Sequence, residues 1–203
     1  MQAASELAHR LPRITLSAAT TLPSGLATLD AALPGGGWPQ GAVTELLPAV
    51  TGIGELSLLM PALAQLTQAG RQVALLAPPC LPYAPALLQQ GVDLGQLLWI
   101  RASHDAALLW SAEQLLRCPA VGAVLLWPRQ IDDRRVRRLQ LAAEAGGGCA
   151  WLYRPAVADR QSSPAALRLR LHPLADGLRL DIFKARGGLA RAVVVHTAAA
   201  AAA

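Results

Sequence analysis

Hydrophobic and polar residues alternate in blocks between about residue 42 and residue 153. Short continuous apolar runs, typical of strands buried on both faces of a sheet, are separated by segments in which apolar residues recur every three to four positions. The pattern predicts strands at 42–47, 72–77, 97–101, 121–127 and 149–153, and helices at 55–69, 83–90, 106–117 and 133–145. Pro61 is expected to kink the first of these helices. This alternation predicts an α/β fold with a mostly parallel sheet flanked by helices.

The last fifty residues follow a different pattern. Leucines at 167, 169 and 171 alternate with arginines, and the run at 178–182 alternates in the same way after a turn at 173–177. Such a pattern predicts a C-terminal antiparallel hairpin extension with one apolar and one charged face, followed by a strand at 189–196. Residues 22–196 are therefore expected to form one domain, with a flexible arm at 1–21 and a disordered alanine tail at 197–203.

Ligands of parallel sheets bind beyond the carboxyl ends of the strands, so the loops at 48–54, 78–82 and 127–131 should share one edge. The first loop stands where a phosphate-binding loop would lie, between a strand and a helix. A working loop reads G-x-x-x-x-G-K-[ST], whose lysine binds phosphate and whose hydroxyl binds Mg²⁺. Here the sequence is Gly52, Ile53, Gly54, Glu55, which lacks both groups. The Glu55 carboxylate would favour the dipole of the expected helix start but repel a nucleotide.

Two other positions of an ATPase site are also degenerate. The segment around Pro79 has no carboxylate to orient an attacking water, and the strand at 121–127 ends on Trp127 rather than on an aspartate that could organise Mg²⁺. Backbone N–H groups at Gly52 and Gly54 could still bind an anion weakly. The hypothesis is a protein that is not an enzyme and has no cofactor.

Charge is distributed unevenly along the 203 residues. The net charge is +5, and residues 151–203 carry all of this excess. A basic end on a neutral body indicates an acidic partner, either nucleic acid or a protein surface, although a solvated face is the alternative. Two groups of arginines are the contact candidates, one on a predicted helix and one on the hairpin: Arg134, Arg137, Arg138, and Arg168, Arg170, Arg179. Aromatic residues do not interleave with them, so DNA is only weakly supported as a partner.

The three cysteines, Cys80, Cys118 and Cys149, are scattered and show no metal-ligand spacing. This pattern predicts free thiols, no metal site and a cytoplasmic location. No apolar run is long enough to predict a membrane span, and no signal peptide is expected at the N-terminus.

Several stretches resemble the RecA recombinase core over roughly residues 20–195. They are the segments at 22–33 and 36–45, the degenerate phosphate loop, and the helix and turn that end at Gly91-Val92-Asp93. Within this group, Gly36-Gly37-Trp38-Pro39 and Gly52-Ile53-Gly54-Glu55-Leu56 look like the ImuA family. Members of that family are small bacterial RecA-like proteins encoded with ImuB and an error-prone replicative-type DNA polymerase.

This resemblance implies a non-catalytic accessory factor of SOS-induced translesion DNA synthesis and mutagenesis. The implied partners are RecA and an ImuB-like homologue of the Y-family polymerases, with indirect contact to the error-prone polymerase. The segments that would correspond to the DNA-binding loops of RecA are 129–133 and 156–164, and both look short. Two alternatives remain open. One is SulA, an SOS cell-division inhibitor that binds FtsZ, and the other is a DNA-binding RecA-like ATPase.

Overall fold

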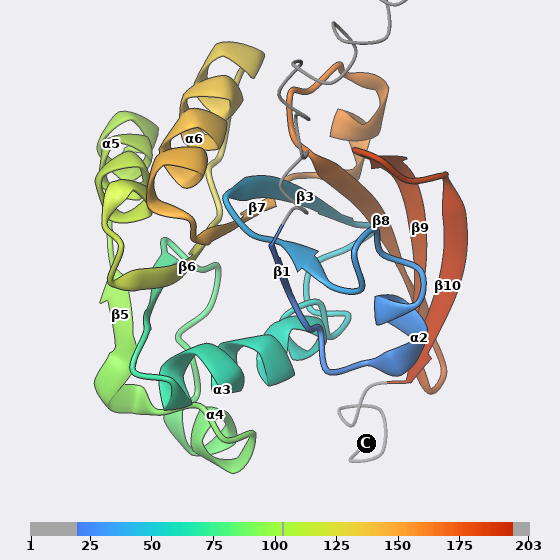
Figure 1. Cartoon of the computed structure of the whole chain (residues 1–203), viewed down its shortest axis with the longest axis horizontal. Coiled ribbons are helices and arrows are strands. Elements are labelled where there is room, and N and C mark those ends of the chain that lie inside the picture. The colour runs from blue at the N-terminus through green and yellow to red at the C-terminus, as the bar shows by residue number, and fades with distance from the viewer. Residues whose placement is uncertain (1–19, 103, 197–203) are drawn as a thin grey trace, which may run out of the picture.

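A computed structural model describes residues 20–102 and 104–196. The expectations for the tail at 197–203 and for most of the arm at 1–21 lie outside these residues. Within the described residues, an eight-stranded sheet has the order β10-β9-β8-β3-β7-β6-β4-β5 (Figure 1). Its strands are β3 (Ala42–Pro48), β4 (Gln72–Leu76), β5 (Leu97–Ile100), β6 (Val121–Leu126), β7 (Cys149–Tyr153), β8 (Leu167–Leu174), β9 (Gly177–Ala185) and β10 (Arg191–His196).

The sheet is mainly parallel. Strands β8, β3, β7, β6, β4 and β5 pair in parallel, whereas β9 pairs antiparallel with β8 and with β10. The predicted α/β class, the mostly parallel sheet and the antiparallel hairpin are confirmed. The hairpin is nevertheless part of the main sheet, because β8 lies along β3 from the Thr44–Leu167 pair to the Pro48–Leu171 pair.

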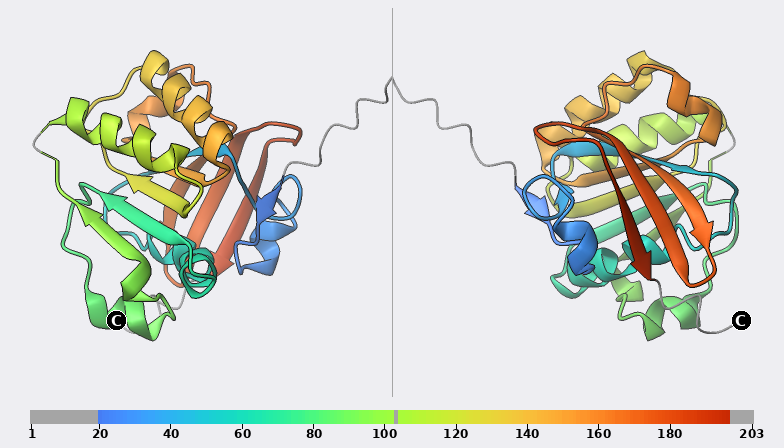
Figure 2. Two further views of the ribbon diagram at one scale, coloured as in Figure 1. Left: turned by 60° about the vertical axis from the view of Figure 1, so that its left-hand side comes forward. Right: turned by 90° about the vertical axis from the view of Figure 1, so that its right-hand side faces the viewer.

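Helices cover both faces of the sheet. They are α2 (Ala27–Asp30), α3 (Met60–Gln68), α4 (Ala84–Gln89), α5 (Asp105–Arg117) and α6 (Asp133–Gly146). Helices α5 and α6 pack on one face, and α2 and α3 on the other (Figures 1 and 2). The remaining short elements are β1 (Thr21–Leu22), β2 (Trp38–Pro39) and the 3-10 turns η1 (Ser57–Leu59), η2 (Leu94–Gln96) and η3 (Ala156–Arg160).

The expectation of a helix at 55–69 with a kink at Pro61 is wrong. Helix α3 begins only at Met60, after η1, and Pro61 lies in its first turn. A proline in the first turn removes an N–H that has no partner within the helix, so it starts a helix without bending it. The phosphate-loop region therefore leads into an irregular turn and not directly into an α-helix.

Two hydrophobic clusters fix the sheet between its helices. Successive side chains of a strand point to opposite faces, so Trp151 and Tyr153 of β7 pack toward α3 while Ala150 and Leu152 pack toward α6. Trp151 meets Trp38 edge to face, with ring centroids 5.9 Å apart. This packing holds the carboxyl ends of the central strands in fixed positions.

Candidate functional site at the carboxyl edge of the sheet

The loops that follow β3, β4 and β6 meet at one edge, as the strand pattern predicts, and the loop after β7 lies beside them. A cavity of about 380 Å³ lies among the segments 48–51, 127–129 and 153–156. A second cavity, of about 330 Å³, lies between the loops after β4 and β6 and is lined by Pro79. Trp127 and Arg129 line both cavities. This edge is where an α/β protein of this topology would hold its ligand.

The Glu55 side chain turns back onto the degenerate loop. The Gly52 N–H donates to both carboxylate oxygens of Glu55, at N···O distances of 2.9 and 3.2 Å. Gly52 has a φ of +87°, a conformation that glycine adopts without steric cost, and Glu55 is only 7% exposed. In a phosphate loop such an N–H would face a phosphate oxygen. Glu55 therefore caps its own loop, and the expectation that it acts at a helix start is wrong.

A second carboxylate performs the same role after β6. The backbone N–H groups of Arg129 and Gln130 donate to the two carboxylate oxygens of Asp105, at 3.1 and 2.9 Å. Asp105 is the first residue of α5, so its side chain extends from the start of that helix to the loop after β6. The sequence offered no sign of this contact, because the partners are 24 and 25 residues apart. Backbone donors from two loops of this edge are thus bound by carboxylates of the chain itself.

Aromatic rings fill the centre of the edge. Trp127 stacks on Tyr153 with ring centroids 4.5 Å apart and planes within 5° of parallel. The Tyr153 hydroxyl donates to the carbonyl oxygen of Glu55 at 3.3 Å. Burial, and secondarily the negative charge of Glu55, raises the pKa of Tyr153 well above its usual value. Trp127 thus places an indole ring directly after β6, at the position where an ATPase would carry a Mg²⁺-organising aspartate. Among the described residues, no group of three His, Cys, Asp or Glu is arranged to hold a metal ion.

A buried ionic network lies just behind this edge. Glu45 of β3 has no exposed side-chain surface, and it accepts hydrogen bonds from Arg154 at 3.0 Å and from Arg168 and Ser163 at 2.6 Å. Arg154 also donates to the Gln161 side chain at 2.6 Å. The network ties the segment after β7 to β3 and β8. Sequence reasoning missed Glu45, whose acid group stands alone in an apolar strand.

The hairpin arginines occupy three different environments. Arg168 is 4% exposed, because η3 covers its side of β8 and the carbonyl oxygens of Ala158 and Gln161 accept from its guanidinium. Its assignment to a solvent-facing contact surface is therefore wrong. Arg170 is partly buried and pairs with Asp159 at 3.0 Å, and Arg179 is exposed and pairs with Asp181 at 3.0 Å.

The helix arginines lie on the surface. Arg134, Arg137 and Arg138 are exposed on α6, whose opposite side packs into the core through Val136 and Leu139. Arg138 pairs with Glu113 of α5 at 2.8 Å. The other two side chains form no ion pair or hydrogen bond with any residue that the structure describes. They remain available as contact candidates.

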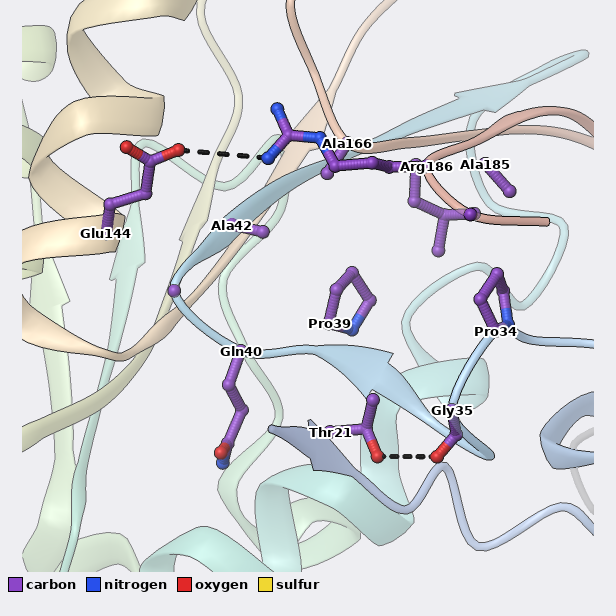
Figure 3. Close-up of a pocket in the computed structure, with 13 residues that line it drawn as sticks. Thr21, Pro34, Gly35, Pro39, Gln40, Ala42, Glu144, Ala166, Ala185 and Arg186 are labelled. Carbon is purple, nitrogen blue, oxygen red and sulfur yellow. Dashed lines mark hydrogen bonds and ion pairs between the residues drawn. The ribbon is translucent and has the colours of Figure 1, made fainter. Parts of the chain in front are cut away.

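A separate cavity of about 400 Å³ lies at the opposite edge, near the amino ends of β3 and β8 (Figure 3). Three of the polar side chains that line it have partners within the chain. The Thr21 hydroxyl donates to the carbonyl oxygen of Gly35 at 2.8 Å, and Arg186 lies 3.9 Å from Glu144. Most of the remaining lining is apolar, so the cavity does not indicate the chemistry of a ligand.

Comparison with known proteins finds similarity to ImuA, RecA and SulA. No family model matches. ImuA from Caulobacter vibrioides is 32% identical over 129 residues, which cover 61% of this chain and 53% of that protein. RecA from a Picosynechococcus species is 34% identical over 109 residues, 52% of this chain and 30% of that protein. SulA from Yersinia pseudotuberculosis is 27% identical over 147 residues, 72% of this chain and 84% of that protein.

The chain is ImuA-like and related to RecA and SulA. The resemblance inferred from the loop motifs is thereby confirmed. The matched region spans about half the length of the ImuA relative. Among solved structures, SulA from Pseudomonas aeruginosa is 26% identical and matches 55% of this chain and 97% of its own, with a TM-score of 0.46. In the part of the chain that the structure describes, no helix has the length and apolar character needed to cross a membrane.

Proposed function

We propose that this chain is a non-catalytic accessory factor of SOS-induced translesion DNA synthesis and mutagenesis, built on a RecA-like sheet and acting through protein–protein contacts. The observation that carries the proposal is the Glu55 carboxylate on the Gly52 N–H, at the position where a RecA-like ATPase would bind phosphate. The ImuA likeness supports the SOS role.

The chemistry of the edge argues against hydrolysis of ATP. A phosphate oxygen and the Glu55 carboxylate would compete for the same N–H, and two like charges so close repel strongly in a partly buried site. Ile53 and Gly54 supply neither the ammonium nor the hydroxyl that would offset this repulsion. A nucleotide would have to displace Glu55, and the loop itself supplies no cation in its place.

The partners we propose are RecA and an ImuB-like homologue of the Y-family polymerases, with an indirect link to an error-prone replicative-type DNA polymerase. Exposed arginines on α6 without ion partners are suited to acidic protein surfaces. DNA is a weaker candidate, because the arginines do not surround a row of exposed aromatic rings.

A second function is favoured by one observation. The SulA alignment covers 84% of that relative, against 53% for ImuA. A SulA-like cell-division inhibitor that binds FtsZ would also need no ATPase site. The two functions make opposite predictions about which protein is bound after DNA damage.

Co-purification separates these functions. The affinity-tagged chain, expressed at its native level, is recovered from cells treated with a DNA-damaging agent, and bound proteins are identified by mass spectrometry. The accessory-factor proposal predicts an ImuB-like protein and RecA. Recovery of FtsZ, together with filamentous cells after expression of the chain alone, would instead establish the cell-division role. Recovery of none of these proteins would contradict both.

A further inference from the structure

Helices α5 and α6 lie side by side on the outside of the molecule (Figure 2). Each helix connects two parallel strands, so each runs opposite to the strands and both run in the same direction. The Glu113–Arg138 pair at 2.8 Å fixes how far one helix is shifted along the other. One turn before this pair lie Trp110 and Arg134, and one turn after it lie Arg117 and Leu141.

Two large apolar side chains stand out on this surface. Trp110 is 62% exposed and Leu141 is 52% exposed, although both lie within helices whose other side is buried in the core. A single exposed apolar residue is ordinary in a folded protein. Here two of them flank one interhelical ion pair, one on each helix. We name the surface formed by Trp110, Leu141, Arg117, Arg134 and Arg137 the helix-pair face.

The charged side chains of the helix-pair face are three arginines. Arg117, Arg134 and Arg137 are exposed and form no ion pair or side-chain hydrogen bond with the residues that the structure describes. The nearby carboxylates have partners within the chain, and Glu113 is the one whose partner is an arginine side chain. Asp132 accepts from the Arg135 N–H, Asp133 accepts from the Ser162 hydroxyl, and Glu113 pairs with Arg138. The three exposed guanidinium groups are therefore available to acidic side chains of a partner.

We propose that the helix-pair face binds an acidic amphipathic helix of a partner protein. Two helices that run side by side leave a shallow groove between them, into which the apolar stripe of a third helix packs. Leucines of that helix would cover Trp110 and Leu141, and acidic residues on both sides of its stripe would pair with the arginines. Tryptophan and arginine are the residues that most often dominate protein–protein binding.

The same surface is less suited to nucleic acid. Trp110 is the one aromatic ring of the helix-pair face, and Leu141 offers no ring on which a second base could stack. This inference rests on the proposed function for the existence of a protein partner, and it assigns the surface that such a partner would use.

The test measures fluorescence anisotropy of labelled peptides titrated with the full chain. The probe is a synthetic helix with leucines at i, i+3, i+4 and i+7 and glutamates on both flanks. One control peptide has the same composition in scrambled order, and another carries lysine in place of glutamate. A labelled single-stranded oligonucleotide serves as the nucleic-acid probe.

Two double variants remove the two halves of the face: Trp110→Ala with Leu141→Ala, and Arg134→Glu with Arg137→Glu. Each is expected to weaken binding of the acidic helix by about tenfold or more, a loss typical of interface hot spots. The matched controls are Leu189→Ala, which removes a leucine that is 76% exposed elsewhere, and Arg160→Glu, which changes an exposed arginine on η3. Both are expected to bind within about twofold of the unmodified chain. Circular dichroism verifies that every variant is folded.

The inference is overturned if the acidic helix does not bind, if the scrambled or lysine peptide binds equally well, or if neither double variant weakens binding. It is also overturned if the oligonucleotide binds more tightly and only the arginine changes affect it. A different result would contradict the proposed function. If RecA and the ImuB-like protein are absent from the co-purification but the acidic peptide still binds, the proposed partners are wrong and the assignment of the helix-pair face still holds.

Discussion

Replacing Glu45 by glutamine probes the network that joins the site to the sheet. The Glu45 side chain is fully buried, and the two arginine side chains that it pairs with, Arg154 and Arg168, are each 5% exposed. Glutamine keeps the shape and removes the charge. Removing one partner of a buried ion pair destabilises a protein by about 3–5 kcal/mol, because an uncompensated charge remains. Both pairs share one carboxylate, so we expect a total loss of about 4 kcal/mol and not twice that amount.

Urea unfolding followed by circular dichroism measures this loss. With a slope of about 2 kcal/mol per molar urea, the unfolding midpoint of Glu45→Gln should fall by about 2 M. The control is Arg179→Ala, which removes an exposed arginine paired with Asp181 and should cost less than about 1 kcal/mol. If Glu45→Gln also loses less than about 1 kcal/mol, the two guanidinium groups must reach water, and the buried network does not hold the edge together.

Three further predictions concern two groups, the Glu55 carboxylate and the Cys149 thiol. In Glu55→Ala the Gly52 N–H loses both of its acceptors. Its hydrogen exchange, followed by NMR, should accelerate about tenfold or more, and an unchanged rate would mean that Glu55 does not cap the loop. Burial raises the pKa of Cys149 to about 12, whereas Cys80 and Cys118 are exposed. A thiol reagent at pH 8 should therefore modify two cysteines in the folded protein and the third only after unfolding. Because the thiol is neutral when folded and ionises near its ordinary pKa of 9.0 when unfolded, stability should fall as the pH rises from about 9 toward 12, by up to about 1.4 kcal/mol per pH unit. Cys149→Ala should flatten this decline, and an equally steep decline in that variant would contradict the assignment.

Much of the fold was readable from the sequence because the central strands are buried on both faces. Continuous apolar runs therefore marked β3 to β7 within one or two residues at each end. The sequence contains no comparable signal for which distant strands pair with one another. The alternation at 167–171 predicted which residues share a face of β8, but it could not show that β8 pairs with β3. It also could not show that η3 covers Arg168, so the regular charged pattern predicted a solvent-exposed position for a side chain that is buried.

The candidate site likewise combines features that the sequence predicts with features that it does not. The missing lysine and hydroxyl of the phosphate loop are local features, as is Glu55, three residues from the Gly52 N–H that it binds. Asp105 and Glu45 act on residues far along the chain, and Glu45 meets Arg154 and Arg168 across 109 and 123 residues. Only the folded sheet brings these groups together.

The central claim is that the carboxyl edge is capped by the chain's own carboxylates and does not serve ATP hydrolysis. The most direct test is isothermal titration of the purified chain with Mg²⁺–ATP, combined with measurement of phosphate release in the presence of single-stranded DNA. The account predicts no saturable heat of binding and no DNA-stimulated phosphate release at millimolar ATP. Stoichiometric binding of ATP, with phosphate release that rises when DNA is added, would contradict it and establish a DNA-dependent ATPase.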